Sequence, residues 1–549
     1  MISEYVGEIE ELPPDSRMRS GQRYRKYLYH TARAAIWTAN VYYLVRLLTI
    51  LLEPQKSWQM WLMLAVEAIF GRLSYQDQRL TVAAGGEPER GPRKRLRLRG
   101  SQNLPRVDVL IPCCGEPVSV ILATVRAACT MDYPESQLTI RVLDDGASTE
   151  LRDAISELHS KWPYLFYHTR GRQSGRVFAK AGNLNYALFT VQKDTPPEFC
   201  AILDADSIPQ PEFLRATLPH LLLSPQAALV TTRQYFDNLP AGDPLSQSRL
   251  HFYTCQNAEL DRCGRAIDAG SGAVFRRNAI IDIGGYPTFS FSEDWQLSLI
   301  LQGMGYRTVQ VQEPLQFGLV PTSLEGHIAQ RNRWHIGHSQ QLFALRPLTN
   351  SSMPRNLQWS IACGGLAITL GLLGHIIGFG AVPWLLMSRS LIPASSSSLI
   401  KTQVILGLLH VSTMWAYGWL QTAHAGIRGS PFSQLENSWL AGGKNVPFYP
   451  LVSAIDICMI TTRLTRLIAS LCSTSICCHT ISFHFERSQR IICHRKQRKL
   501  LESHHEVFIL QNAIPGSVAK RHFAKHLPAC RYNCCDVIVN MDDTDHYRQ

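Results

Sequence analysis

The chain has 549 residues, enough for one large domain with additional segments, and 45% of them are hydrophobic, as in ordinary soluble proteins. Its formal net charge is +12, but much of the basic excess lies in residues 91–100 and in the C-terminal tail. No stretch interleaves basic and aromatic side chains in a stripe, so the pattern excludes a nucleic-acid partner.

Two apolar runs near the N-terminus, 34–52 and 58–73, predict a transmembrane hairpin over residues 31–73. The segment before it, residues 1–30, is polar and charged, so we expect no cleavable signal peptide. Basic residues flank the outer ends of the hairpin, whereas the loop between the runs holds one lysine. By the positive-inside rule, both ends of the hairpin are expected in the cytosol.

The hydrophilic block after the hairpin is therefore also expected to be cytosolic. It divides into a basic linker, residues 74–104, and a folded domain, residues 105–350. Its six cysteines are expected to stay reduced, because the cytosol does not favour disulfides.

Short apolar runs alternate with helical patterns from residue 105 onward. This alternation predicts an α/β domain with a mostly parallel sheet, in which ligands bind beyond the carboxyl ends of the strands. No G-x-G-x-x-G sequence follows the first strand, which removes the main support for a dinucleotide-dependent hydride transfer. The predicted strands are 107–112, 139–146 and 199–206, and the predicted helices are 118–131, 149–161 and 211–223.

Two carboxylates in the sequence DADS, Asp204 and Asp206, follow the third predicted strand. In an extended chain, residues two apart point to the same side, so these carboxylates would repel each other unless a cation lay between them. Oxygen ligands suit Mg²⁺ or Mn²⁺, and such an ion would neutralise a diphosphate leaving group. We therefore predict a divalent-metal site at Asp204 and Asp206, with an exposed acidic turn as the alternative.

Three further residues are candidates for binding a nucleotide. Asp144 and Asp145 end the second predicted strand, where they can accept hydrogen bonds from a uracil imide and a ribose hydroxyl. A strand-end turn explains the same residues equally well. Lys180 is a candidate phosphate partner, with a solvated lysine at a helix start as the alternative.

The sequence AGSGAVFRR supplies small residues, Gly270, Ser271 and Gly272, where a backbone can approach a sugar acceptor. Its alternative is a plain turn into a strand. Glu293 and Asp294 open a predicted helix, where capping and the helix dipole favour carboxylates in any protein. The functional interpretation makes Asp294 a general base.

A later helical segment carries Gln330, Arg333 and Trp334 at positions i, i+3 and i+4, so they share one helix face. Arg331 and Asn332 are expected to point elsewhere. The simplest interpretation is a surface arginine stacked on a tryptophan.

Taken together, DDG (144–146), DAD (204–206), SED (292–294) and QRNRW (330–334) resemble the motifs of family 2 inverting glycosyltransferases with a GT-A fold. More narrowly, residues 105–345 resemble the membrane-embedded cellulose-synthase-like and polysaccharide-synthase branch. The implied fold is an α/β GT-A nucleotide-sugar-binding domain with a mostly parallel sheet, flanked by transmembrane helices.

The resemblance implies a role for each donor-side residue. Asp144 and Asp145 would hold the uridine, and Lys180 would approach the diphosphate. Asp204 and Asp206 would hold the nucleotide diphosphate, with Asp206 on the Mg²⁺ or Mn²⁺ ion.

The resemblance also implies the catalytic set. Asp294 would deprotonate the acceptor hydroxyl, with Glu293 and Arg333 beside it. Gln330, Arg333 and Trp334 would close the site, with Trp334 as a flat floor under the acceptor sugar. Attack opposite the leaving group would convert an α-linked donor into a β-linked product.

The C-terminal part divides into three segments. Two apolar runs without Asp, Glu, Lys or Arg predict transmembrane helices over residues 357–427. Residues 428–470 resemble an interfacial, gating-like segment of the same branch. Residues 471–549 are rich in Cys and His but lack the paired C-x-x-C spacing of a zinc site. We interpret them as an atypical tail that is either disordered or the product of an aberrant gene model.

The resemblance thus implies a multi-pass integral membrane enzyme with a cytosolic catalytic domain. It would transfer a sugar from a UDP-sugar, with UDP-glucose as the expected donor, to a growing β-glucan-like polysaccharide. Two alternatives stay open: transfer of one sugar to a lipid or another small acceptor, and a catalytically impaired membrane paralogue.

Overall fold

The computed structural model describes residues 8–14, 21–54, 57–86, 93–171, 178–342, 355–377 and 397–427, together with positions 380, 384 and 387. All of them belong to the first of two compact units, Met1–Val446. The predicted gating-like segment and the Cys/His-rich tail lie outside the described residues.

A seven-stranded sheet forms the centre of the unit, in the order β11-β8-β10-β6-β3-β4-β5. Strand β10 is antiparallel to β6 and β8, and the other neighbours pair in parallel. The predicted mostly parallel α/β sheet is therefore confirmed. The strands are β3 (Val107–Cys113), β4 (Leu138–Asp144), β5 (Leu165–His168), β6 (Phe199–Ile202), β8 (Ala227–Thr232), β10 (Ala273–Arg276) and β11 (Arg307–Val311).

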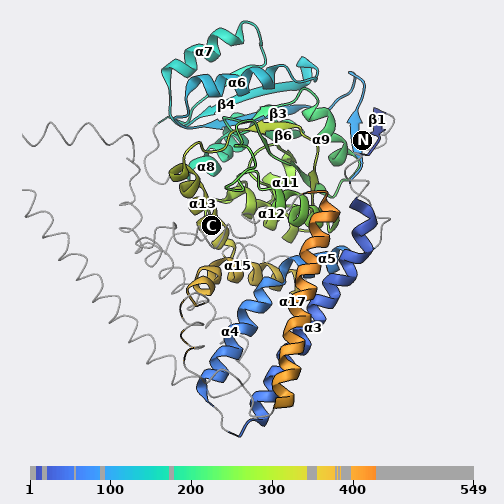
Figure 1. Cartoon of the computed structure of the whole chain (residues 1–549). Coiled ribbons are helices and arrows are strands. Elements are labelled where there is room, and N and C mark those ends of the chain that lie inside the picture. Colours follow the sequence, from blue (N-terminus) through green and yellow to red (C-terminus); the bar gives the residue numbers. More distant parts are fainter. Residues whose placement is uncertain are drawn as a thin grey trace, which may run out of the picture. The chain divides into compact units, whose positions relative to one another are not determined.

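Helices cover both faces of this sheet (Figure 1). Alternate residues of β3 face opposite layers, so Val109 packs with one apolar cluster and Leu110 with the other. The first cluster takes side chains from α6 (Val118–Cys129), α7 (Thr149–His159) and α9 (Phe213–Leu222). The second takes them from α8 (Ala179–Tyr186), α11 (Arg277–Asp282) and α12 (Glu293–Gly303).

Two smaller sheets extend this core. One joins β7 (Ile208–Pro209), β12 (Gln316–Gly318) and β9 (Tyr235–Phe236). Its strand β12 is followed in the chain by α13 (Leu324–Ser339). The other pairs β1 (Ile9–Leu12) with β2 (Arg95–Leu98). Arg97 of β2 pairs with the carboxylates of Glu212 and Glu313, which fastens this hairpin to the core.

The third predicted strand is shorter than expected. Strand β6 ends at Ile202, and the chain then turns, with the Ser207 amide donating to the Asp204 carbonyl at 2.9 Å. The extended geometry that we assumed for Asp204 and Asp206 is therefore wrong. The turn is anchored at Ala205, which is buried and whose carbonyl accepts a hydrogen bond from the Thr124 hydroxyl of α6.

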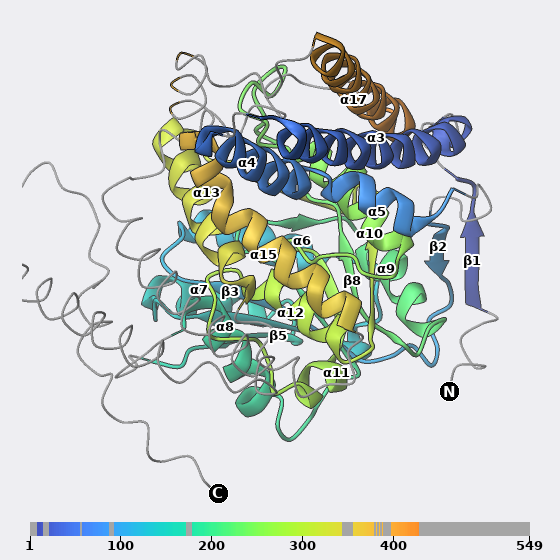
Figure 2. The ribbon, with the colours of Figure 1, turned by 90° about the horizontal axis from the view of Figure 1, so that it is seen from below.

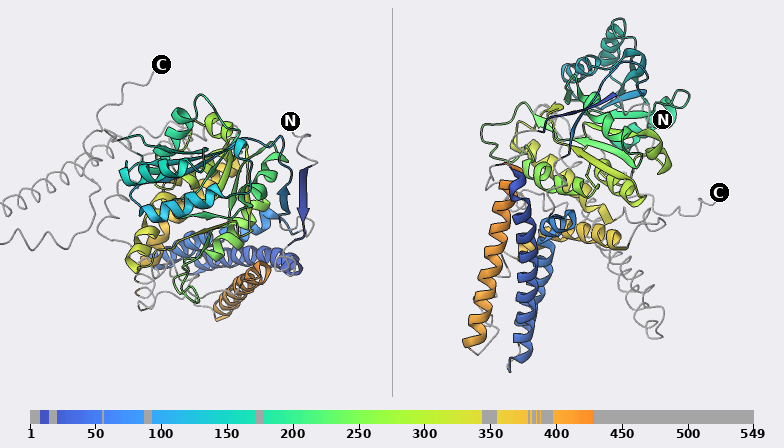
Figure 3. Two further views of the ribbon diagram at one scale, coloured as in Figure 1. Left: turned by 90° about the horizontal axis from the view of Figure 1, so that it is seen from above. Right: turned by 90° about the vertical axis from the view of Figure 1, so that its right-hand side faces the viewer.

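Long apolar helices stand at both ends of the described chain. By length and composition alone, Gln22–Leu52 and Ser398–Ala425 qualify as membrane spans among the described residues, whereas Trp58–Gly71 is a shorter apolar helix. Helices α3 and α17 run side by side (Figure 3), with Thr38 and Thr413 hydroxyls 3.1 Å apart. The bounds are α3 (Arg25–Leu52), α4 (Trp58–Ser74), α5 (Gln76–Ala84), α15 (Arg355–Ile376) and α17 (Ser397–Ala425).

Two of these helices are tied to the α/β core. Buried Arg25, at the start of α3, pairs with Glu259 of α10 (Asn257–Arg262). Helix α15 runs beside α13 (Figure 2), and the Gln341 side chain donates to the Ile361 carbonyl at 2.8 Å. Ile361 packs in an apolar cluster with Phe252 of the core. Whether residues 357–427 cross a membrane stays a prediction.

Candidate functional site

Lys180 lies at the centre of the site. Its Nζ donates to a carboxylate oxygen of Asp204 and, at 2.6 Å, to the Gly270 carbonyl, and it lies 3.9 Å from a Glu293 carboxylate oxygen. Burial opposes the charge of Lys180, but Asp204, Glu293 and Asp294 outweigh this effect and raise the pKa of the amine. Lys180 is therefore a cation held by acidic groups from two separate segments.

The two carboxyls that open α12 lie beside this cation, with Glu293 buried and Asp294 half-buried. Burial, followed by the charge of Asp294, raises the pKa of Glu293 to about 7. Burial also raises the pKa of Asp294, although Lys180 acts in the opposite direction. A carboxyl with a raised pKa is a stronger base once it is ionised, which suits proton abstraction near neutral pH.

We expect Glu293→Gln to stabilise the protein at alkaline pH. Because the pKa of Glu293 is raised on folding, the folded state binds this proton more tightly than the unfolded state. The resulting stability is present below the unfolded pKa and is lost as the pH rises through about 7. The melting temperature of Glu293→Gln should therefore exceed that of the wild type near pH 8 and match it near pH 5.

The control for this measurement is Glu157→Gln, which changes an exposed carboxylate on α7. It should leave the melting temperature close to that of the wild type at both pH values. A Glu293→Gln protein that is less stable than the wild type near pH 8 would show that Glu293 is a stabilising ionised group instead.

Asp206 and Asp204 would supply part of the coordination of a divalent cation, and a bound ligand would supply the rest. Burial, followed by the neighbouring Asp204 carboxylate, raises the pKa of Asp206 to about 6. Among the described residues, no group of three or more His, Cys, Asp or Glu side chains forms a complete metal site. Phosphate oxygens and water would have to supply the remaining ligands, as is usual for Mg²⁺.

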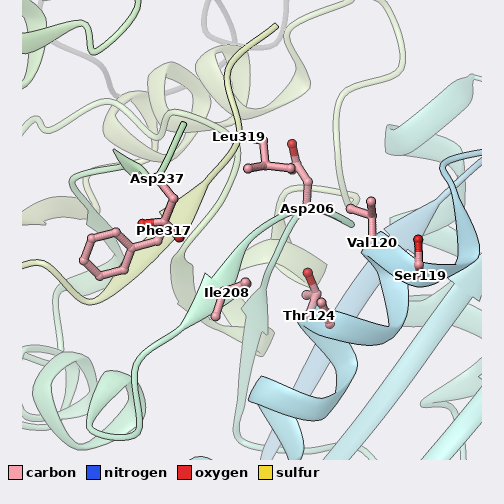
Figure 4. A pocket seen from close by; sticks show the side chains of 9 residues that line it. Ser119, Val120, Thr124, Asp206, Ile208, Asp237, Phe317 and Leu319 are labelled. Atoms are coloured by element: carbon pink, nitrogen blue, oxygen red, sulfur yellow. The ribbon is translucent and has the colours of Figure 1, made fainter. Parts of the chain in front are cut away.

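A cavity of about 200 Å³ borders Asp206. It lies between the first turns of α6 and the small sheet of β7, β9 and β12 (Figure 4). Ser119 and Thr124 contribute hydroxyls on the α6 side, and Phe317 and Leu319 give apolar walls on the other. The cavity places open space directly beside the predicted metal ligand.

The Asp144 carboxylate accepts hydrogen bonds within its own turn. One carboxylate oxygen accepts from the Gly146 amide at 2.7 Å, and the other accepts from the Ser148 amide at 2.7 Å and the Tyr167 hydroxyl at 2.8 Å. The side chain is buried. These contacts match the turn interpretation, so a contact between Asp144 and uridine stays a prediction.

Asp145 has a partner that the sequence did not reveal. Arg170, two residues after the end of β5, donates to both of its carboxylate oxygens, at 2.8 and 2.6 Å. The same guanidinium lies 3.3 Å from the Ala179 carbonyl, one residue before Lys180. Arg170 thus links the carboxyl end of β4 to the start of α8, a contact between segments that no local pattern encodes.

The loop of Gly270, Ser271 and Gly272 is rigidly held. The Ser271 hydroxyl accepts from the Asp204 amide at 3.0 Å and donates to the Gln316 side chain at 3.0 Å. Gln316 is itself buried and donates to the Ser271 carbonyl and to Thr232, each at 2.8 Å. Gln316 was missed because a single glutamine in a short strand carries no sequence signal.

The QRNRW helix is confirmed, but the expected orientation of its arginines is wrong. Arg331, three residues before Trp334, places its guanidinium 4.6 Å from the Trp334 ring centre, and Arg249 lies at 5.3 Å. Positions i and i+3 are neighbours on a helix, so Arg331 reaches the ring directly. Arg333 is exposed, and within the described part of the chain it forms no hydrogen bond or ion pair. Its guanidinium is therefore available to a ligand.

Helix α13 is also pressed against the start of α12. The Gly337 carbonyl accepts from Gln296 at 3.0 Å and from Ser290 at 3.1 Å. A Cβ at Gly337 would lie 2.2 Å from the Ser292 hydroxyl oxygen and 2.7 Å from its amide. A glycine is therefore required where the two helices meet.

We expect Gly337→Ala to displace α13 from α12 and to lower the melting temperature, despite the gain of about 1 kcal/mol in helix propensity. Gly326→Ala is the matched control on the same helix, because its Cβ would approach no atom closer than 3.1 Å. Thermal unfolding of both variants checks this prediction. Equal melting temperatures for the two variants would contradict it.

Sequence comparison identifies a family model and known proteins that this chain resembles. Residues 105–337 match the sequence model described as Glycosyltransferase like family 2. The UDP-forming cellulose synthase catalytic subunit of Xanthomonas axonopodis pv. citri is 36% identical over 256 residues, which cover 45% of this chain and 34% of that protein. Its counterpart in Pseudomonas fluorescens is 33% identical over 262 residues, covering 46% and 33%. The chain thus spans about a third of the length of these relatives.

Among solved structures, the mannosyltransferase PcManGT of Pyrobaculum calidifontis, in complex with GDP-Man and Mn²⁺, is similar with a TM-score of 0.47. Its sequence identity is 20%, and the match covers 68% of this chain and 97% of that one.

Proposed function

We propose that this chain is a membrane-bound inverting glycosyltransferase that uses a UDP-sugar, a proposal supported by the match of residues 105–337 to the Glycosyltransferase like family 2 model. UDP-glucose is the proposed donor, and a growing β-glucan-like polysaccharide is the proposed acceptor. The observation that carries the proposal is the convergence of Lys180, Asp204 and Asp294 around the Gly270 loop.

The donor diphosphate is proposed to bind beside Lys180 and Asp206. The Lys180 ammonium offers donors to phosphate oxygens, and the exposed guanidinium of Arg333 can bind two of them at once. A divalent cation on Asp206 would supply charge neutralisation at the diphosphate. Lys180 and Arg333 stabilise the charge that develops on the leaving group, which is where electrostatic catalysis acts most strongly.

The acceptor hydroxyl is proposed to lose its proton to Asp294. Gly270 has no side chain, and one Asp294 carboxylate oxygen lies 2.4 Å from where its Cβ would stand. The backbone at Gly270 therefore borders the base directly. Trp334, held by Arg331 and Arg249, is the proposed floor for the acceptor sugar. Attack from the side opposite the diphosphate inverts the anomeric carbon.

The membrane location of the enzyme is also a proposal. It is supported by the two long apolar helices and by exposed tryptophans on α17, with Trp415 78% and Trp419 64% accessible. Amphipathic tryptophan side chains are favoured at membrane interfaces. The basic flanks of the first hairpin support a cytosolic catalytic domain.

The test is UDP release from membranes that express the full chain, with a panel of UDP-sugars and Mg²⁺ or Mn²⁺. We expect release with one donor, loss of release on chelation of the metal, and loss in Asp206→Asn. A long labelled product supports the polymer, whereas a single added sugar supports transfer to a lipid or small acceptor. Folded protein that binds UDP but turns over no donor would overturn the proposal and indicate an impaired paralogue.

A further inference from the structure

Asp268 is a buried carboxyl that belongs to none of the motifs described above. It lies in the chain just before β10, two residues from Gly270. One of its carboxylate oxygens accepts from the Thr231 hydroxyl and from the Gly270 amide, each at 3.1 Å. Through these two hydrogen bonds, the Asp268 carboxylate holds the Gly270 backbone in position.

A second path connects Asp268 to the start of α12. The Asp268 amide donates to the Ser298 hydroxyl at 2.9 Å, and that hydroxyl donates to the Asp294 carbonyl at 3.1 Å. Gly270 itself accepts from Lys180 and leaves no room for a side chain beside Asp294. Asp268 is thus joined to the proposed base both through Gly270 and through Ser298.

The charges around Asp268 and Asp294 are unbalanced. Burial, followed by the Asp294 carboxylate, raises the pKa of Asp268 to about 7, and Lys180 acts in the opposite direction. The other ionisable groups that face the two aspartates are Asp204 from the loop after β6, Glu293 from α12, and the buried phenols of Tyr253 and Tyr286. Several carboxyls therefore share the Lys180 charge.

We propose that Asp268 is a positioning residue for the transfer step, which holds Gly270 against Asp294 and places a second negative charge behind the base. This inference rests on the proposed glycosyltransferase function. The two neighbouring carboxyls share protons, so an ionised Asp268 favours the protonated form of Asp294 and makes it more basic. The two hydrogen bonds hold the backbone that lies between Asp294 and Lys180.

Asp268→Asn separates these two contributions. The asparagine side chain keeps an oxygen that accepts from Thr231 and Gly270, but it carries no charge. Asp294 then no longer shares a proton with its neighbour, so the base stays ionised to lower pH and becomes weaker. A purely structural role for Asp268 would leave the pH dependence of kcat unchanged.

The experiment measures UDP release by the full-length protein across pH, with UDP binding as a separate readout. For Asp268→Asn we expect kcat to fall roughly three- to ten-fold, the acidic limb of the pH profile to move to lower pH, and the donor KM to stay within about two-fold. Asp268→Ala, which also loses both hydrogen bonds, should lower kcat further. Asp153→Asn, an exposed position on α7, is the charge-matched control and should behave as the wild type.

Two results would overturn the inference alone. One is an Asp268→Asn enzyme with the wild-type kcat and an unmoved acidic limb. The other is loss of UDP binding in Asp268→Asn, because the residue would then serve the fold and not the base. Absence of UDP release from the wild type with every donor would instead overturn the proposed function, and the role of Asp268 with it.

Discussion

Asp294→Asn is expected to lower UDP release by roughly 10²- to 10⁴-fold, the usual contribution of a general base. The amide cannot accept the proton of the acceptor hydroxyl, although it has nearly the same shape as the carboxylate. UDP binding should persist, because removing a negative charge beside Lys180 does not weaken the attraction for a diphosphate. Initial rates of UDP release and equilibrium binding of UDP measure the two effects separately.

The control for this substitution is Asp282→Asn, which changes an exposed aspartate at the end of α11 in the same domain. It should retain the wild-type rate. If Asp294→Asn kept a rate within about ten-fold of the wild type, the proton would have to leave through another group. Glu293, buried one residue away, would then be the next candidate.

Gly270→Ala is expected to cause the second large loss of activity. Gly270 has φ of +98°, and an added Cβ would lie 2.4 Å from an Asp294 carboxylate oxygen. Because the loop is fixed by Lys180 and Asp268, Asp294 must move in response. A displacement of about 1 Å in a reacting group can lower a rate roughly 100-fold.

Gly284→Ala separates this collision from simple backbone strain. Gly284 also has a positive φ, +85°, but a Cβ there would meet no atom within 4 Å. Both substitutions should lower the melting temperature through a strain of about 1–2 kcal/mol, whereas only Gly270→Ala should reduce UDP release. Equal rates in the two variants would show that the Gly270 backbone and Asp294 do not meet during catalysis.

The sequence predicted the elements of the fold closely, because each depends on local periodicity. The expected strand at 107–112 is β3, and the expected helix at 118–131 is α6, with ends that differ by no more than two residues. The alternation of these elements also predicted that the aspartates would gather at one edge of the sheet, since the carboxyl ends of parallel strands meet there.

Two local predictions failed for identifiable reasons. The extended geometry of Asp204 and Asp206 failed because β6 ends at Ile202, after which the chain turns. The orientation of the QRNRW arginines failed because i, i+3 contacts and a distant residue, Arg249, decide which guanidinium reaches Trp334. In both cases tertiary contacts outweighed the local pattern.

The sequence by itself determined the α/β class, the order of the motifs and the residue types available for metal, diphosphate and base chemistry. Only the tertiary structure decided which partners they take: Lys180 with Asp204 and Gly270, Asp145 with Arg170, and Asp268 with Gly270. It also showed that α13 meets α12 where Gly337 has no room for a side chain. The physical reason is that periodicity and motif spacing act over neighbouring residues, whereas these contacts join segments that packing brings together from distant parts of the chain.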